Sequence, residues 1–405
     1  MIRVILSTFG PLHLVKSAEY LSRLVDISLI QGWIPAWWNR WLLIIGDKLL
    51  GYKLSKTIKK RNPYCLKGRN IGIGIPEFYA WIARRYLHDR FSNMKAAIMY
   101  GKLSRKYIKN ADIFHVRSGS GLGGAIEKAK SEGMKVIVDH SIAHPVFMGK
   151  NLKNEFERNG EFFNLGDDNP FWQHVLSDCK KADALLVNSN FVKETFVQQG
   201  FDASKIVVLY LGVREDFLEL KKSYKLSKKI KLLFTGSFGF RKGGEYLLRA
   251  LRLLEDIGVK CELTIVGGYS EGKTLLEKYP SKNINLTGVV PQDEIKAYLQ
   301  NADLYVFPSL CEGCAQSGME ALAAGLPVIA TYESGLPIEN GVNGLIVKSK
   351  DEKAIVDAIL RLVGDERLRE KIGRTAMERM KNYTWDMYAS DVVKLYTRLL
   401  NSSAE

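Results

Sequence analysis

Hydrophobic and polar positions along this 405-residue chain follow two patterns that alternate from one end to the other. Short continuous apolar runs, which are typical of buried parallel strands, alternate with stretches in which apolar residues recur every three or four positions, as in amphipathic helices. The predicted strands are residues 2–6, 112–116, 135–139, 184–188, 206–211, 231–235, 262–266, 284–290, 304–308 and 328–330. A helix is predicted from about residue 13 to residue 30. Regular alternation of strands and helices predicts an α/β protein with parallel sheets.

The alternation is interrupted once, at residues 214–229, where apolar periodicity disappears and the charged run KKSYKLSKK appears. A chain of this length exceeds what one hydrophobic core usually holds, so two domains are expected. We place them at 1–213 and 225–382, with a last helix in 383–405.

The most informative stretch is 307–331, FPSLCEGCAQSGMEALAAGLPVIAT, which reads as strand, loop, short helix, turn and strand. Ser317 stands three residues before Glu320, the spacing of a helix capping box, and Gly325 follows the last helical turn. Glu312 and Glu320 therefore fall near the carboxyl end of one strand, where open α/β sheets bind ligands.

A second loop, 236–244, is rich in glycine and carries the adjacent cations Arg241 and Lys242 just before a predicted helix. Glycines allow close backbone approach, and cations neutralise negative charge, so the loop suits a diphosphate. A solvated Arg-Lys pair would give the same pattern.

The spacing of Glu312 and Glu320, inside PS-x-x-EG-x6-EA-x-A-x-G-x-PVIA, resembles the donor site of retaining GT-B glycosyltransferases of family 4. The resemblance implies a GT-B fold, in which two Rossmann-like domains face a central cleft and the last helix crosses back to the first domain. It implies transfer from a UDP- or GDP-sugar to an acceptor hydroxyl with retention of the anomeric configuration. It implies no obligatory metal and no cofactor.

The resemblance also assigns roles to residues. Glu320 would bind the ribose, Glu312 the donor sugar, and Lys242 with Arg241 the departing diphosphate. His140, at the end of strand 135–139, would orient the sugar, with His144 as a second candidate. The further donor-binding residues are Gly239, Val290, Gly313, Cys314, Ala315, Gln316 and Ser317, and the acceptor side includes Gly10 and Gly121. The chain departs from the family pattern at Ser237, where an arginine is usual, and at Gly10, where a glycine pair is common.

A competing signal is the loop Gly119–Gly124, which has the form G-x-G-x-x-G between a strand and a helix and is followed by the acid Asp139. That arrangement is a dinucleotide-binding fingerprint, so an NAD(P)-dependent enzyme is the alternative function.

Charge is unevenly distributed, since residues 1–213 carry a net charge of +13 of the total of +15. Residues 48–109 alone hold 16 basic and 2 acidic residues, which indicates an anionic partner. A lipid surface or a phosphorylated substrate is expected rather than nucleic acid. A non-catalytic polyanion-binding protein is a further alternative.

Four tryptophans, Trp33, Trp37, Trp38 and Trp41, precede the basic run that contains Lys53, Lys56, Lys59, Lys60 and Arg61. Lys102, Lys106 and Lys109 are spaced to share one side of a helix. Tryptophan favours membrane interfaces and cations favour anionic lipids, so the first domain is expected to lie on the inner face of the cell membrane. No apolar run is long enough to span a bilayer, and the N-terminal run is too short for a signal peptide. The expected acceptor is a lipid-linked glycan of cell-surface polysaccharide or glycolipid synthesis.

The five cysteines are too few to indicate a disulfide framework. Cys311 and Cys314 form a C-x-x-C pair with redox or metal potential, but no second pair completes a zinc site.

Overall fold

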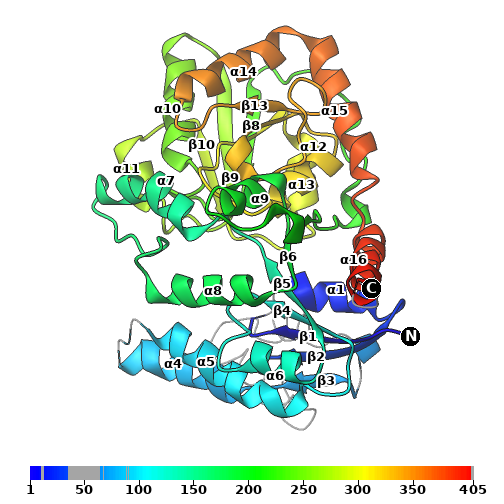
Figure 1. Cartoon of the computed structure of the whole chain (residues 1–405). Coiled ribbons are helices and arrows are strands. Elements are labelled where there is room, and N and C mark those ends of the chain that lie inside the picture. The colour runs from blue at the N-terminus through cyan, green and yellow to red at the C-terminus, as the bar shows by residue number, and fades with distance from the viewer. Residues whose placement is uncertain (11–12, 35–63, 67, 88, 90, 403–405) are drawn as a thin grey trace, which may run out of the picture.

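The computed structural model describes residues 1–10, 13–34, 64–66, 68–87, 89 and 91–402. Its chain forms two parallel sheets, each with helices on both sides (Figure 1). This confirms the predicted pair of Rossmann-like α/β domains.

The first sheet has the strand order β3-β2-β1-β4-β5-β6-β7. Its strands are β1 (Arg3–Thr8), β2 (Asp26–Gln31), β3 (Asn70–Gly72), β4 (Ile113–Arg117), β5 (Lys135–His140), β6 (Ala184–Val187) and β7 (Ile206–Val208). The helices of this part are α1 (His13–Leu21), α4 (Ile75–Tyr86), α5 (Ser92–Ser104), α6 (Ala125–Ser131), α7 (Pro145–Glu157), α8 (Pro170–Lys181) and α9 (Asn190–Val197).

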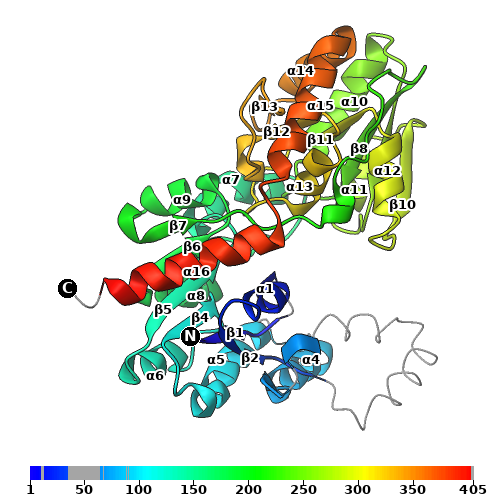
Figure 2. The same cartoon turned by 90° about the vertical axis from the view of Figure 1, so that its right-hand side faces the viewer.

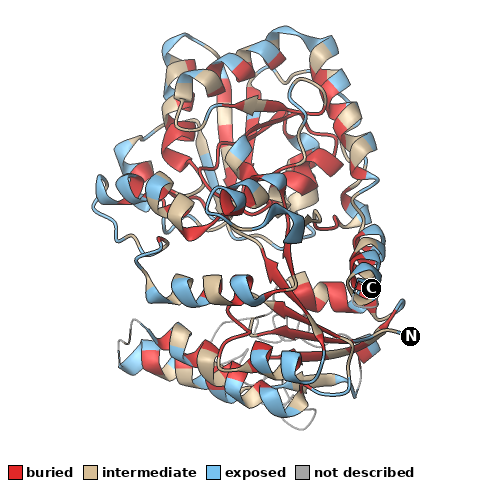
Figure 3. Ribbon diagram, in the orientation of Figure 1, coloured by how far each residue is buried: buried red, intermediate tan, exposed pale blue. Residues whose placement is uncertain are grey.

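The second sheet has the order β10-β9-β8-β11-β12-β13. Its strands are β8 (Ile230–Thr235), β9 (Cys261–Val266), β10 (Ile284–Gly288), β11 (Leu304–Phe307), β12 (Val328–Thr331) and β13 (Leu345–Val347). Its helices are α10 (Gly244–Asp256), α11 (Lys273–Lys278), α12 (Ile295–Asn301), α13 (Gln316–Ala323), α14 (Glu352–Gly364) and α15 (Glu366–Met380). The central strands are buried on both faces (Figure 3), as their continuous apolar runs require.

The helix predicted through residue 30 was wrong in its second half. The helix expected through residue 30 ends at Leu21, and β2 follows it and pairs in parallel with β1, Val4 opposite Ile27. The isoleucines and leucine of DISLIQ fit either a helical or an extended period, and pairing with β1 decides between them.

The last helix, α16 (Trp385–Asn401), returns from the second sheet and packs on the first (Figure 2). Thr384 pairs with Val213 just before the helix, and the Tyr396 hydroxyl lies 2.7 Å from Nδ1 of His115 in β4. Gly212 touches the backbone of Trp385 so closely that a side chain there would clash. The chain therefore crosses between the two parts twice at neighbouring points.

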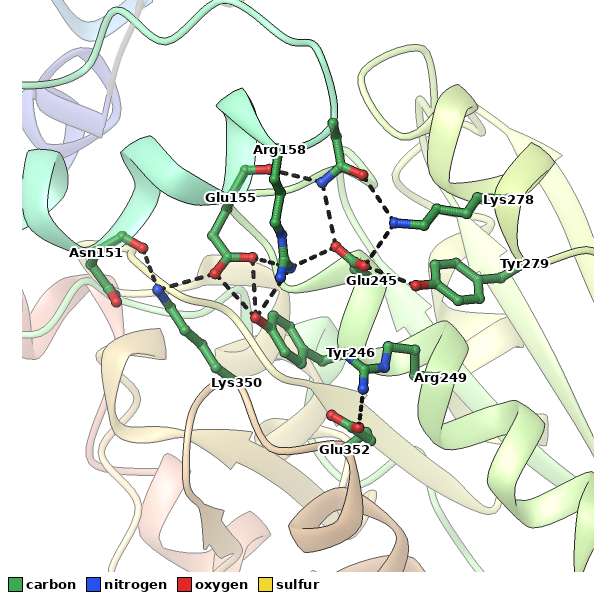
Figure 4. A network of polar contacts seen from close by, with 11 residues as sticks. Asn151, Glu155, Arg158, Glu245, Tyr246, Arg249, Lys278, Tyr279, Lys350 and Glu352 are labelled. Carbon is green, nitrogen blue, oxygen red and sulfur yellow. Dashed lines mark hydrogen bonds and ion pairs between the residues drawn. The ribbon is translucent and has the colours of Figure 1, made fainter.

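Helix α7 joins the two parts through a network of charged and polar side chains (Figure 4). Arg158 lies 2.5 Å from Glu155 of α7 and 2.7 Å from Glu245 of α10. Both carboxylates are buried, and Lys350 and Lys278 add an ion pair to Glu155 and to Glu245, respectively. Asn151 of α7 also donates a 2.5 Å hydrogen bond to the carbonyl of Leu310. The network holds α7 against the loop that follows β11.

Candidate active site between the two sheets

Two cations and one carboxylate meet at the carboxyl edge of the second sheet. Nζ of Lys242 lies 2.8 Å and a guanidinium nitrogen of Arg241 lies 2.6 Å from the same oxygen of Glu312. Burial would raise the pKa of Glu312, but Arg241 and Lys242 overcome this effect and lower it, so the carboxylate is ionised. The two cations predicted to bind a diphosphate are thus held side by side around a single negative charge.

The loop after β8 brings Lys242 to this position. Gly243 has a φ of +69°, and a side chain there would meet the carbonyl of Pro308 at 1.9 Å. The Lys242 ammonium lies 4.8 Å from the centre of the Phe307 ring and 3.6 Å from where a Cβ on Gly236 would stand. Because Gly236 has no side chain, a ligand can approach its backbone next to the Lys242 ammonium. Arg241 supplies a second cation next to Lys242, although Ser237 occupies the usual arginine position.

Glu320 lies in α13, is 6% exposed, and accepts a 3.2 Å hydrogen bond from Gln292. Burial raises the pKa of Glu320 to about 7, and the nearby charges of Arg214 and Lys16 oppose that rise. Lys16 comes from α1, so both parts of the chain shape this carboxyl group. Lys16, Arg214 and Gln292 were missed from sequence because no local motif links them to Glu320.

The capping box predicted for α13 was wrong. The N-cap residue is Ala315, which has no capping side chain, and Ser317 lies inside the helix. Ser317 instead accepts a 3.1 Å hydrogen bond from the Tyr305 hydroxyl of β11. Glu320 therefore has no capping role, and its role as a donor-binding residue stays a prediction.

Gly313 lies where the two parts of the chain touch. A side chain on it would meet the Ser141 carbonyl at 2.0 Å, and the Ser189 hydroxyl donates a 2.5 Å hydrogen bond to its carbonyl. Gln316 donates to the Gly212 carbonyl at 3.2 Å, while Cys314 and Ala315 are buried. Gly239 packs closely against Glu271, and the half-buried Val290 follows β10. The contact with Ser141 brings the Glu312 loop next to the end of β5.

His140 ends β5 and is 1% exposed. Its Nδ1 lies 2.9 Å from the Ser118 hydroxyl, while its Nε2 has no hydrogen-bond partner among the described residues. Burial, helped by the charge of Arg117, lowers the pKa of His140 to about 3, so the ring is neutral. A neutral imidazole with one ring nitrogen unsatisfied can bind a hydroxyl group.

His140 lines a pocket of about 320 Å³ in the first part of the chain. Gly10 lines the same pocket, and a Cβ on it would meet no atom within 4 Å. The other lining residues are Phe9, Asn93, Ala97, Arg117, Ser118, Gly119, Ser120, Ile142, Phe171, Trp172 and Val175. The aromatic residues of α8 were missed from sequence because nothing local separates a pocket wall from core packing.

Gly121 does not belong to this pocket. Its amide and that of Gly119 donate to Oδ2 of Asp178 in α8, at 3.1 and 2.8 Å. Side chains of Ile126 and Asp178 fill the space where a Cβ on Gly121 would point. Gly121 therefore packs against the interior side of its loop, and its acceptor-side role stays a prediction.

The same geometry disfavours the dinucleotide interpretation. A pyrophosphate would need the loop amides that Asp178 already occupies. Asp139, the acid expected to bind a ribose, is 3% exposed and lies 2.9 Å from both His13 and Arg117. Both halves of the NAD(P) fingerprint are therefore used in internal contacts.

Three minor candidates have structural positions. His144 caps α7 by accepting from the Val146 amide at 3.2 Å, and burial lowers its pKa to about 4. Cys311 and Cys314 are free and buried, and burial raises the pKa of the Cys311 thiol to about 12. Across the described residues, no cluster of three His, Cys, Asp or Glu side chains could hold a metal ion.

The membrane prediction falls largely outside the described residues, which exclude Trp37, Trp38, Trp41 and the cations from Lys53 to Arg61. Trp33 packs on Gly74 and its amide donates to Glu77. The helix expected to carry Lys102, Lys106 and Lys109 together was wrong, since α5 ends at Ser104 and a short 3-10 turn, Arg105–Tyr107, follows. Among the helices described, none combines the length and apolar character needed to cross a bilayer.

Two family descriptions match the chain: Glycosyltransferase Family 4 over residues 68–217 and Glycosyl transferases group 1 over residues 216–379. The amylovoran biosynthesis glycosyltransferase AmsK of Erwinia amylovora is 31% identical over 47% of this chain and 52% of its own length. The capsular polysaccharide biosynthesis glycosyltransferase CapM of Staphylococcus aureus is 26% identical over 56% of this chain and 62% of its own length. The chain thus spans about half to three fifths of these relatives.

Solved structures share the fold over nearly the whole chain. Sucrose-phosphate synthase of Thermosynechococcus elongatus superposes with a TM-score of 0.69 at 16% identity, covering 99% of this chain and 100% of its own. HepE of Anabaena, solved in complex with UDP-glucose, superposes with a TM-score of 0.64 at 13% identity, covering 98% and 100%. These structures show that the chain has the GT-B fold. The two family models match consecutive parts of the chain, residues 68–217 and 216–379, so the chain belongs to the glycosyltransferases of the family 4, group 1 type.

Proposed function

We propose that this protein transfers a sugar from a UDP- or GDP-sugar to a hydroxyl group of a lipid-linked glycan, in the synthesis of a cell-surface polysaccharide or glycolipid. The observation that carries the proposal is the pair Arg241 and Lys242, held on Glu312 at the carboxyl edge of the second sheet. The polysaccharide context comes from the relatives named for amylovoran and capsular polysaccharide synthesis. The nucleotide donor is supported by the neighbour that was solved with UDP-glucose.

In this proposal the donor diphosphate lies beside Gly236 and binds Arg241 and Lys242 in place of Glu312. Both cations then stabilise the charge that grows on the leaving diphosphate, which lowers the barrier more than it strengthens donor binding. Because two fixed positive charges already stand there, the reaction needs no obligatory metal or cofactor. Glu320 accepts hydrogen bonds from the ribose hydroxyls, since an ionised carboxylate offers two acceptor oxygens.

The acceptor enters the pocket beside His140, on the other side of the Gly313 contact. The neutral His140 ring forms a hydrogen bond with a sugar hydroxyl, as donor or acceptor, and so orients the ring of the donor sugar. The acceptor oxygen attacks on the face that the diphosphate leaves, the bond to the diphosphate breaks, and the departing phosphate oxygen takes the acceptor's proton. The anomeric configuration is therefore retained without a protein nucleophile. The enzyme acts at the inner face of the cell membrane, where its acceptor is anchored.

A panel of sugar nucleotides in a thermal-shift assay tests the donor. A ligand at a hundred times its Kd stabilises the fold by about 2.7 kcal/mol, which is a readable shift. Proton NMR of the product should then show the donor's anomeric configuration. An inverted product would contradict the mechanism, and complete loss of turnover in EDTA that magnesium restores would contradict the role given to the cations.

A further inference from the structure

Helix α4 shows its large apolar side chains to solvent. Ala80 and Ala83 form its buried stripe, whereas Phe78 and Trp81 are 63% and 53% exposed. Positions 78, 81 and 85 follow one helical face, opposite the alanines, and Arg85 is exposed there as well. A helix at a protein surface normally turns its polar residues outward. The outward face of α4 is therefore built to contact something other than water.

The exposed apolar surface continues beyond α4. Six of the large apolar side chains exposed in the described part of the chain fall between residues 75 and 91: Ile75, Phe78, Trp81, Tyr86, Leu87 and Phe91. The rings of Phe78 and Trp81 stack with centroids 6.1 Å apart, and the Tyr86 ring meets Trp81 edge-on at 6.0 Å. Large apolar side chains that gather at a surface in this way mark interaction sites. We call these six residues the α4 surface.

The α4 surface leads toward the proposed acceptor pocket. Phe91 lines a hollow of about 540 Å³ together with Phe162, which is 73% exposed, and Pro170 at the start of α8. Asn93, two residues after Phe91, and Phe171, directly after Pro170, line the pocket that contains His140. Apolar surface thus extends from the face of α4 toward the place where the acceptor would bind.

The charge around the α4 surface is positive. Residues 64–110 contain ten Lys and Arg against the two acids Glu77 and Asp89. Glu77 accepts from the Trp33 amide and Asp89 pairs with Lys95, so two acids stand against ten cations and the segment keeps a clear positive net charge. The exposed cations of the described residues here are Arg69, Arg84, Arg85, Lys95, Lys102, Arg105, Lys106 and Lys109.

We propose that the α4 surface lies on an anionic lipid bilayer and so points the acceptor pocket at a membrane-held substrate; the second part of this statement rests on the proposed function. Aromatic side chains settle at the headgroup level, while neighbouring cations are attracted to anionic lipid. A second copy of this chain fits the surface less well, because a symmetric contact would bring Arg84 and Arg85 against their own copies.

Sedimentation with liposomes tests the proposal on the full chain. Vesicles of phosphatidylcholine with phosphatidylglycerol should bind the protein, phosphatidylcholine vesicles should bind it less, and salt should weaken the binding. Phe78→Ser/Trp81→Ser should weaken partitioning about tenfold or more, since burial of one such side chain is worth more than the 1.4 kcal/mol that equals tenfold. Arg84→Glu/Arg85→Glu should weaken binding to the anionic vesicles alone.

Ile257→Ser is the matched control, because Ile257 is 59% exposed at the end of α10, in the other domain. It should bind vesicles like the wild type. The proposal is overturned if the wild type binds neither vesicle, if the aromatic double variant binds as well as the control, or if that variant only dissolves a dimer seen by sedimentation velocity. A thermal shift with UDP-glucose reports the proposed transferase separately, and the α4 variants should keep it.

Discussion

Asp178 provides a test of how the loop below the acceptor pocket is stabilised. Its Oδ2 accepts both loop amides, and its Oδ1 has no hydrogen-bond partner within the described ranges. Burial raises the pKa of Asp178 from 3.8 to about 7, although the two amides oppose that rise. The folded protein therefore prefers the protonated acid far more than the unfolded chain does.

The sign of the pH dependence follows from this preference. A carboxyl group whose pKa is higher in the folded protein contributes stability that is complete below about pH 4 and is lost as the pH rises through about 7. In Asp178→Asn, the amide oxygen can still accept from Gly119 and Gly121, but no charge is buried. Since one pKa unit equals about 1.4 kcal/mol and the folded and unfolded states differ in protonation over about two pH units in this range, the variant should gain about 2.6 kcal/mol over the wild type between pH 5 and pH 8.

Urea unfolding at pH 5 and at pH 8, followed by far-UV circular dichroism and by tryptophan fluorescence, measures this gain. Any pH-independent effect of the amide cancels in the comparison of the two pH values. Asp112→Asn is the control, because a hydrogen bond from Arg3 lowers the pKa of Asp112 and places its titration below this range. If the stability difference between Asp178→Asn and the wild type were equal at both pH values, the reasoning about the buried carboxyl group would be refuted.

Three further predictions concern the cleft. Glu320→Gln should weaken donor binding and remove the pH dependence of that binding. Burial raises the pKa of Glu320 to about 7, and only the ionised wild-type carboxylate, which is present above that pH, binds the ribose strongly. Calorimetry of donor binding at pH 6 and pH 8 measures both effects. Lys242→Ala should lower kcat about 10²-fold or more with a smaller change in KM, as steady-state kinetics would show, and unchanged turnover would count against the diphosphate assignment. Arg158→Met should destabilise the fold by about 1–3 kcal/mol in urea unfolding. The loss stays this small because Glu155 and Glu245 each keep a lysine partner. A double-mutant cycle with Glu245→Gln should show coupling between positions 158 and 245.

Much of the architecture could be predicted from sequence because local periodicity reports burial. A strand buried on both faces must be continuously apolar, so the predicted strands 135–139, 184–188 and 304–308 match β5, β6 and β11 closely. Turn chemistry is local as well, and the left-handed glycines Gly243 and Gly325 lie where the pattern placed a helix start and a helix end. The short segment of β2 was not recognised because its pattern fits two periods, and only pairing with β1 makes it a strand.

The sequence by itself determined that Glu312, Arg241 and Lys242 stand in loops after strands and that Glu320 stands in the short helix after the Glu312 loop, because local periodicity and turn residues mark where each strand and helix ends. Only the tertiary structure decided what each one meets. Contacts between residues far apart along the chain depend on which loops share a sheet edge, and no local spacing encodes that. Folding therefore placed both cations on Glu312, set Lys16 of α1 near Glu320, and put Asp178 beneath a glycine loop that otherwise resembles a nucleotide site.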